Sequence, residues 1–360
     1  MSSHGLECAH SLSLGGRRLC FYELGKASNL PALVLLPGLT CSAYETLQSV
    51  SSLAESTQMI SIEWRGHGDS APSNGNSSLD DLAADAMAVI RKRLGGRKIC
   101  LLGHSVGAQV LWTMLDQYGN EFRDVLKGII VVDQDPLRMT GRTSSGPHDI
   151  RHAQHEEVAA QLRQGHSQFL QTLRGLFTVD NGFAPSPMKY SKWYSFASRC
   201  HQATIVDLHW DAVTSDFTHT VQGIRVPTLI MAGDATMEAD GIKDRMARAI
   251  PPHGAECAIL EGGSHLVFYQ PDVVVEMVRL ISSFLVDGAC VNHCNKAIAD
   301  HDNSENENCE KSETAQQSHD SWWTWIFGSG HAKSVDADSE EEESGSDVEG
   351  DESNELGSRA

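Results

Sequence analysis

The segment Gly103-His104-Ser105-Val106-Gly107 constrains the fold more than any other part of this sequence. It has the pattern Gly-x-Ser-x-Gly and separates a strand-like apolar run, Ile99–Leu102, from a helix-like run, Val106–Tyr118. A serine on such a strand-to-helix turn holds its hydroxyl above the edge of a sheet. The flanking glycines are needed because side chains there would collide with the neighbouring strand or helix. The pattern therefore predicts that Ser105 is a nucleophile.

Strand-like and helix-like segments alternate along most of the chain. Ser11–Leu24 alternates apolar and polar residues around Gly15-Gly16, which is typical of a β-hairpin. The remaining strands are expected at Ala32–Leu36, Met59–Ile62, Ile99–Leu102, Ile129–Val132, Val226–Met231 and Glu256–Leu260. Helices are expected at Ala43–Glu55, Leu79–Leu94, Val106–Tyr118, Ile242–Ile250 and Pro271–Val286. Strands separated by helices predict an α/β fold, with a mostly parallel sheet flanked by helices.

The stretch between Asp133 and Val226 interrupts this alternation. It contains two helix-like segments, Ala153–Leu176 and Lys189–Gln202, and a loop of this length without structure would be unusual. We therefore expect a helical cap, residues 137–222, inserted into a core formed by residues 1–136 and 223–287.

Residues 288–360 have a different composition from the rest of the chain. They contain 18 Asp and Glu against 4 Lys and Arg, and they carry −14 of the net charge of −20. Such a segment buries too little apolar area to offset its ordering entropy, so we expect a disordered acidic tail. Within it, Trp322, Trp323 and Trp325 favour a short motif that docks on a partner or on the core. Insertion at a membrane interface and no function are the alternatives, and the flanking negative charge opposes anionic lipid.

Composition excludes several classes of function. The first 287 residues are mildly acidic and have no basic stripe, which argues against a nucleic-acid partner. The nine cysteines have no framework spacing, so reduced thiols in an intracellular compartment are expected. No signal peptide and no run of roughly 20 apolar residues is visible, so we expect a cytoplasmic protein without a transmembrane segment.

A nucleophilic serine needs a base and two backbone donors. The predicted base is His265, in Gly262-Gly263-Ser264-His265 after the last strand, because open α/β sheets place their sites at the carboxyl ends of strands. The predicted oxyanion donors are the backbone N–H groups of Val106, which follows the serine, and Leu39, in the loop after the Ala32–Leu36 strand.

With these residues in place, the sequence from about residue 11 to residue 287 resembles the α/β-hydrolases of the haloperoxidase/esterase-like branch. The loop Trp64–Ser70 is similar to the Arg-Gly-x-Gly-x-Ser loop of that family, and the segment Val226–Ile230 and the spacing from His265 to Pro271 also match. The resemblance implies an α/β-hydrolase fold and, with serine at the elbow, an acyl-enzyme intermediate. It also implies that no metal or cofactor is needed.

Two positions depart from the family pattern. Pro37-Gly38 stands where the family often has His-Gly, and Thr236 occupies the usual place of the acid after the seventh strand. Asp234 is the nearest replacement, and we take Ser105, His265 and Asp234 as the predicted triad. The alternatives are a carboxylate after the sixth strand, one farther along the seventh-strand loop, or no carboxylate at all. The candidate residues for these positions are Asp133, Asp135, Glu238 and Asp240.

The expected function is a serine hydrolase that cleaves a small or medium acyl substrate such as an ester, thioester or lactone. The displaced acid keeps a low-turnover ligand-binding protein as one alternative, and a scaffold whose tail recruits partners, with the hydrolase core retained, is another. Two groups of residues invite a metal-site interpretation, but neither has the spacing or partners of a common site, and we expect no metal. These groups are His148, His152 and His155, and Cys290, His293, Cys294 and Cys309.

Overall fold

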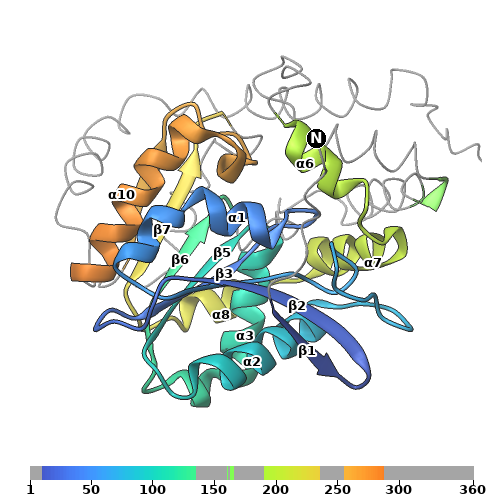
Figure 1. The fold of residues 1–360 in the computed structure, drawn as a ribbon, viewed down its shortest axis with the longest axis horizontal. Helices are drawn as coiled ribbons and strands as arrows, with labels where there is room; N and C mark the ends of the chain where they lie inside the picture. Colours follow the sequence, from blue (N-terminus) through green and yellow to red (C-terminus); the bar gives the residue numbers. More distant parts are fainter. Residues whose placement is uncertain (1–9, 135–159, 161–162, 166–189, 236–254, 288–360) are drawn as a thin grey trace, which may run out of the picture. The chain divides into compact units, whose positions relative to one another are not determined.

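The computed structural model describes residues 10–134, 160, 163–165, 190–235 and 255–287. The predicted helix Ile242–Ile250, nearly all of Ala153–Leu176, both groups of metal-site candidates and the acidic tail with its tryptophans lie outside these residues. The described parts build an α/β fold around one sheet (Figure 1). None of the described helices is long and apolar enough to cross a membrane.

The sheet has eight strands in the order β1-β2-β4-β3-β5-β6-β7-β8. The first three in this order pair antiparallel, and β4 through β8 are parallel. This arrangement confirms the mostly parallel sheet that the alternation predicts. The bounds are β1 His10–Leu14, β2 Arg17–Leu24, β3 Ala32–Leu36, β4 Met59–Ile62, β5 Ile99–His104, β6 Leu126–Val132, β7 Thr228–Gly233 and β8 Ala255–Leu260.

Helices cover both faces of the sheet (Figure 1). One face carries α1 (Ala43–Ser49) and the long α10 (Pro271–Asp287), and the other carries α2 (Leu79–Leu94), α3 (Val106–Phe122) and α8 (Thr218–Gln222). The helix α2 begins with a capping box, in which Ser78 and Asp81 each accept a hydrogen bond from the other's backbone N–H, and it ends at Gly95 in the left-handed region.

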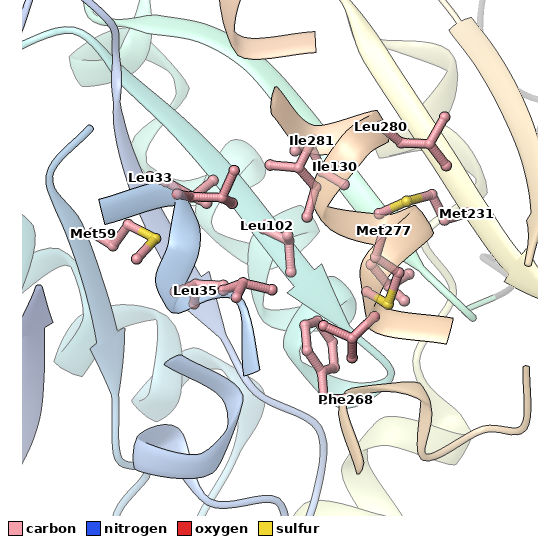
Figure 2. Close-up of a cluster of buried hydrophobic side chains, with 14 of the residues drawn as sticks. Leu33, Leu35, Met59, Leu102, Ile130, Met231, Phe268, Met277, Leu280 and Ile281 are labelled. Atoms are coloured by element: carbon pink, nitrogen blue, oxygen red, sulfur yellow. The ribbon is translucent and has the colours of Figure 1, made fainter. Parts of the chain in front are cut away.

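The core on the α10 side is made of alternate residues from neighbouring strands. Leu33 and Leu35 of β3, and Leu102 of β5, are fully buried and belong to the same cluster as Met277 and Ile281 of α10 (Figure 2). The intervening residues of the same strands are also buried, because helices cover the opposite face. Burial on both faces explains why these strands read as continuous apolar runs in the sequence.

Two helix predictions need correction. The run Ala43–Glu55 is not one helix, because α1 ends at Ser49 and a short 3₁₀ turn, Ser51–Glu55, follows. Ser49 donates its hydroxyl to the Thr46 carbonyl, and serines that bond to nearby backbone groups favour helix ends.

The predicted helix Lys189–Gln202 also divides within its described residues, 190–202. The helix α6 (Ser191–Ala197) ends before His201, which caps the start of a second helix, α7 (Gln202–Thr214). The His201 N–H donates to the Gly66 carbonyl at 2.7 Å, and this contact with the core accompanies the break between the two helices.

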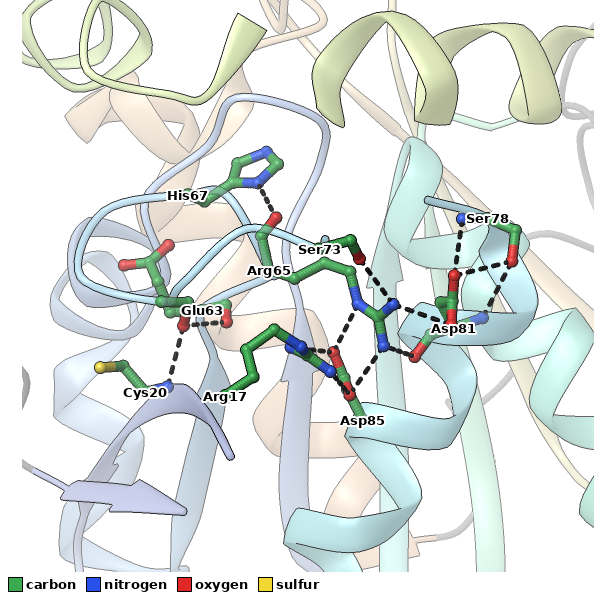
Figure 3. A network of polar contacts seen from close by, with 10 residues as sticks. Arg17, Cys20, Glu63, Arg65, His67, Ser73, Ser78, Asp81 and Asp85 are labelled. Carbon is green, nitrogen blue, oxygen red and sulfur yellow. Dashed lines mark hydrogen bonds and ion pairs between the residues drawn. The ribbon is translucent and has the colours of Figure 1, made fainter. Parts of the chain in front are cut away.

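A buried ionic network fixes the loop that follows β4. Asp85 of α2 accepts bidentate hydrogen bonds from two guanidinium groups, those of Arg17 and Arg65, at 2.9 to 3.2 Å (Figure 3). The Asp85 and Arg65 side chains are only 3% and 7% exposed. The network connects β2, α2 and the loop after β4 through hydrogen bonds. It thereby fixes the position of His67, which lies two residues after Arg65 in this loop.

Replacing Asp85 with alanine should lower the free energy of unfolding by about 3 kcal/mol or more, because it leaves the buried Arg65 without its most buried partner. Urea unfolding monitored by circular dichroism measures this loss. The control is Glu121→Ala, which breaks an exposed pair with Arg91 and should leave the urea midpoint nearly unchanged. Equal midpoints for the two variants would show that the network does not stabilise the fold.

Candidate active site

The carboxyl ends of the central parallel strands bring the predicted site residues to one edge. The register pairs Leu36 of β3 with Gly103 of β5, and His104 with Val132 of β6. The Ser105 N–H donates to the Val132 carbonyl at 3.1 Å, and the residue after Val132 is Asp133. The loops after β3, β5 and β6 therefore begin side by side.

Ser105 occupies a turn that only its glycine neighbours permit. Its backbone has φ 52° and ψ −126°, a conformation that residues other than glycine rarely adopt. A Cβ on Gly107 would lie 1.9 Å from the Leu36 carbonyl oxygen, and one on Gly103 would lie 2.5 Å from the Ala108 Cα. Both glycines are therefore required by close packing of α3 on the strands, as the sequence pattern predicts.

His265 lies between the serine and a carboxylate. Its Nε2 is 2.9 Å from the Ser105 Oγ, and its Nδ1 is 2.6 Å from the Asp133 Oδ2. An ionised carboxylate can only accept, so Nδ1 carries the proton and Nε2 is left to accept from the serine hydroxyl. The Asp133 side chain is 1% exposed and the His265 side chain 15%. These contacts have the geometry of an activated serine.

The carboxylate beside His265 is Asp133 and not Asp234, which the sequence favours. Asp234 is exposed, and its Oδ1 accepts from the Gly262 N–H at 2.7 Å. The Ala235 N–H donates to the Gly263 carbonyl, so the segment after β7 runs along the start of the histidine loop and its carboxylate serves that loop's backbone. The other carboxylates weighed from the sequence, Asp135, Glu238 and Asp240, lie outside the described residues.

Asp133 reaches His265 from a left-handed backbone conformation. Its φ is 49°, a region that aspartate and asparagine enter more readily than most residues, and its N–H donates to the Met231 carbonyl of β7. Asp133 was one of the alternatives after the sixth strand, and the left-handed turn brings its carboxylate against the histidine ring.

His104, within the elbow itself, supports the histidine loop. Its Nε2 lies 2.7 Å from the His265 carbonyl oxygen, and burial lowers the pKa of His104 to about 3. The ring is therefore neutral, and Nε2 carries the proton that it donates to the carbonyl. The motif leaves this position open to any residue, so the sequence does not predict this contact.

The predicted oxyanion donors lie next to the serine. A Cβ built on Gly38 would be 3.3 Å from the Ser105 Cβ, which places the loop after β3 directly against the elbow. Within the described residues, the N–H groups of Leu39 and Val106 donate to no protein acceptor. Two backbone donors without partners beside a serine hydroxyl are what an oxyanion hole requires.

Every carbonyl around Leu39 already has a donor. The Pro37 carbonyl accepts from the Trp64 indole at 2.8 Å, the Gly38 carbonyl accepts from the Cys41 N–H at 3.1 Å, and the Leu39 carbonyl accepts from the Thr40 hydroxyl at 2.6 Å. These hydrogen bonds fix the loop in a conformation that leaves the Leu39 N–H for a ligand.

His67 holds the next residue of this loop. Its Nε2 accepts from the Thr40 N–H at 3.1 Å. Its Nδ1 lies 3.1 Å from the Arg65 carbonyl, as Figure 3 shows. Burial lowers the pKa of His67 to about 4, so the neutral ring donates from Nδ1 and accepts at Nε2. Thr40 has φ 60°, an uncommon conformation for threonine that this hydrogen bond helps to hold. The role of His67 was not foreseen from the sequence, although it lies in the quoted family loop.

Among the described residues, no group of three or more His, Cys, Asp or Glu side chains is placed to hold a metal ion.

Comparison with known proteins places this geometry in a family. The model of the alpha/beta hydrolase family matches residues 33–277. A non-heme haloperoxidase of Rhodococcus erythropolis is 27% identical over 192 residues, which cover 49% of this chain and 64% of that protein, less than two thirds of its length. A bifunctional esterase/perhydrolase of Acinetobacter calcoaceticus is 26% identical over 194 residues, which cover 52% of this chain and 67% of that protein.

A solved structure shows the same fold at lower identity. The esterase of Thermogutta terrifontis superposes with a TM-score of 0.58 at 20% identity, over 76% of this chain and 94% of that one. This similarity agrees with the fold described above, and the family match covers more than half of the sequence. The chain belongs to the alpha/beta hydrolase family.

Proposed function

We propose that this protein hydrolyses small or medium ester-type acyl substrates through an acyl-enzyme on Ser105. The observation that carries the proposal is the continuous chain of hydrogen bonds from Asp133 through His265 to the Ser105 hydroxyl. The similarity to proteins named as esterases supports the substrate class.

In the first half of the reaction, His265 Nε2 takes the proton of the Ser105 hydroxyl while the oxygen attacks the substrate carbonyl carbon. The carbonyl oxygen becomes an oxyanion, which the N–H groups of Leu39 and Val106 stabilise. The tetrahedral intermediate collapses, the bond to the leaving alcohol breaks, and His265 gives its proton to that alcohol. Asp133 stays ionised and holds the imidazolium in orientation throughout.

In the second half, water replaces the alcohol. His265 takes a proton from the water as its oxygen attacks the acyl carbon, and the same two N–H groups stabilise the second oxyanion. Collapse releases the carboxylic acid and returns the proton to the Ser105 oxygen. The free enzyme is regenerated, and the sum of the steps is hydrolysis of one ester bond.

The alternative of a low-turnover binding protein rested on the displaced acid. The Asp133 Oδ2 at 2.6 Å from the His265 Nδ1 supports hydrolysis over this alternative. The proposal therefore keeps hydrolysis as the function.

Hydrolysis of p-nitrophenyl esters with acyl chains from acetate to laurate tests the proposal. We expect release of p-nitrophenol far above the background of Ser105→Ala protein, with a maximum among the shorter chains. Saturable binding of these esters without turnover would instead identify a binding protein and overturn the proposal.

A further inference from the structure

The segment Tyr190–Trp193, at the start of α6, contacts both halves of the site. Tyr190, which precedes α6, has its hydroxyl 2.7 Å from the Ser264 Oγ, and Trp193 of α6 donates its indole N–H to the Thr40 Oγ1 at 3.3 Å. The two side chains are three residues apart, a spacing that places them on one face of a helix, and they are 4% and 1% exposed. Figure 1 shows α6 apart from the core helices α2 and α3.

The Trp193 contact acts on the oxyanion loop. The Thr40 hydroxyl has one proton and gives it to the Leu39 carbonyl at 2.6 Å, so it accepts from the indole with a lone pair. Both polar groups of the Leu39–Thr40 peptide are therefore hydrogen-bonded. The Leu39 carbonyl accepts from the Thr40 hydroxyl, which itself accepts from Trp193, and the Thr40 N–H donates to His67. This peptide adjoins the Gly38–Leu39 peptide, which carries the Leu39 N–H, so fixing it restricts the orientations open to that N–H.

The Tyr190 contact acts on the histidine loop. The Ser264 hydroxyl lies 2.8 Å from the Gln270 Oε1, an acceptor, so Ser264 donates there and Tyr190 donates to Ser264. Gln270 also accepts from the Ser264 N–H and donates to the Gly262 carbonyl. The tyrosine thus joins a buried network around the residue that directly precedes His265.

We propose that Tyr190 and Trp193 are positioning residues through which the cap segment aligns the two halves of the active site. This inference rests on the proposed function. A single helical turn holds the loop of the oxyanion donor and the loop of the base at a fixed separation. That separation matters most when the oxyanion and the imidazolium are both present, which is in the transition state. The cap therefore contributes to the rate of the chemical step and not only to enclosing the substrate.

Two substitutions test this role. Tyr190→Phe removes one hydroxyl, and Trp193→Phe removes the indole N–H together with part of the ring, so its packing loss is judged against a matched tryptophan. We expect each to lower kcat about tenfold with KM changed less than about twofold, because the loss of one buried hydrogen bond to a positioned loop is worth about a factor of ten. A trifluoromethyl ketone inhibitor, whose serine adduct carries an oxyanion, should lose affinity by the same factor.

Two other substitutions serve as matched controls. Tyr194→Phe changes a tyrosine on the same helix that is 42% exposed, and Trp112→Phe removes the same atoms from a fully buried tryptophan whose indole nitrogen has no partner in the described structure. Both controls should keep kcat and inhibitor affinity close to the wild-type values. Melting temperatures of all four variants show whether they remain folded.

The outcomes distinguish this inference from the function on which it rests. Wild-type protein that hydrolyses no ester removes the proposed function, and this inference with it. Active wild-type protein with unchanged kcat in Tyr190→Phe and Trp193→Phe overturns the positioning role alone. Losses confined to KM, or equal losses in Trp112→Phe, also overturn it, because they indicate substrate contact or packing.

Discussion

Ester hydrolysis by Ser105→Ala protein is expected to be at least about 10⁴-fold slower in kcat than hydrolysis by the wild type. Alanine keeps the Cβ and the elbow backbone but removes the atom that forms the acyl-enzyme, and the two backbone donors alone supply only a small part of the acceleration. Steady-state rates with the best p-nitrophenyl ester measure the loss.

The same substitution should leave the fold intact. Ser105 Oγ is in contact with the His265 ring, and removing it leaves the hydrogen bond between the other ring nitrogen and Asp133 in place. A melting temperature close to that of the wild type is the control. A folded Ser105→Ala protein that retains hydrolysis would place the nucleophile elsewhere.

The second large effect is expected at Asp133. Asp133→Asn should lower kcat by on the order of 10⁴-fold, because an amide at that position can donate to Nδ1 and leaves the wrong nitrogen of His265 protonated. Asparagine also accepts the left-handed backbone at this residue, with φ 49°, so the loss is one of proton position and not of fold.

Asp234→Asn is the matched comparison, since it makes the same chemical change at the carboxylate that the sequence favours. An amide oxygen can still accept from the Gly262 N–H, so kcat should fall no more than a few-fold. Rates for both variants, measured with the same ester, decide between the two residues. A large loss in Asp234→Asn with little loss in Asp133→Asn would contradict the observed triad geometry.

The sequence predicts the features that depend only on residues close together in the chain, namely the strands and the elbow. Buried parallel strands are continuous apolar runs, and the elbow needs glycines because of close contacts within one strand–turn–helix unit. Ser105 and His265 are placed by such patterns, since each follows a strand whose end is marked by glycine. The mostly parallel sheet, and the position of Ser105 on the turn between β5 and α3, therefore follow from the sequence.

The sequence does not predict which carboxylate lies beside His265, because this depends on the path in three dimensions of the loop after β8. His265 follows the edge strand β8 and must reach back across β7 to Ser105 at the end of β5. The residue it meets on the way is Asp133, at the end of β6, while Asp234 is turned toward the backbone of that same loop. Counting residues from the end of β7 does not reveal that the His265 loop passes over the end of this strand.

The supporting residues were missed for a similar reason. His67 and His104 are buried, and each forms a hydrogen bond with a backbone group far away in the sequence, that of Thr40 or of His265. Nothing in the sequence around either histidine identifies that partner. The roles proposed for Tyr190 and Trp193 depend on hydrogen bonds to Ser264 and Thr40, which lie far away in the sequence and are marked by no local pattern.

Labelling with a fluorophosphonate probe, followed by digestion and mass spectrometry, tests the central claim most directly. The account predicts one adduct per chain on the peptide that contains Ser105, formed much more slowly in Asp133→Asn protein and at a nearly normal rate in Asp234→Asn protein. Folded wild-type protein that is not labelled, or an adduct on another residue, would contradict the assignment of Ser105 as a serine activated by His265 and Asp133.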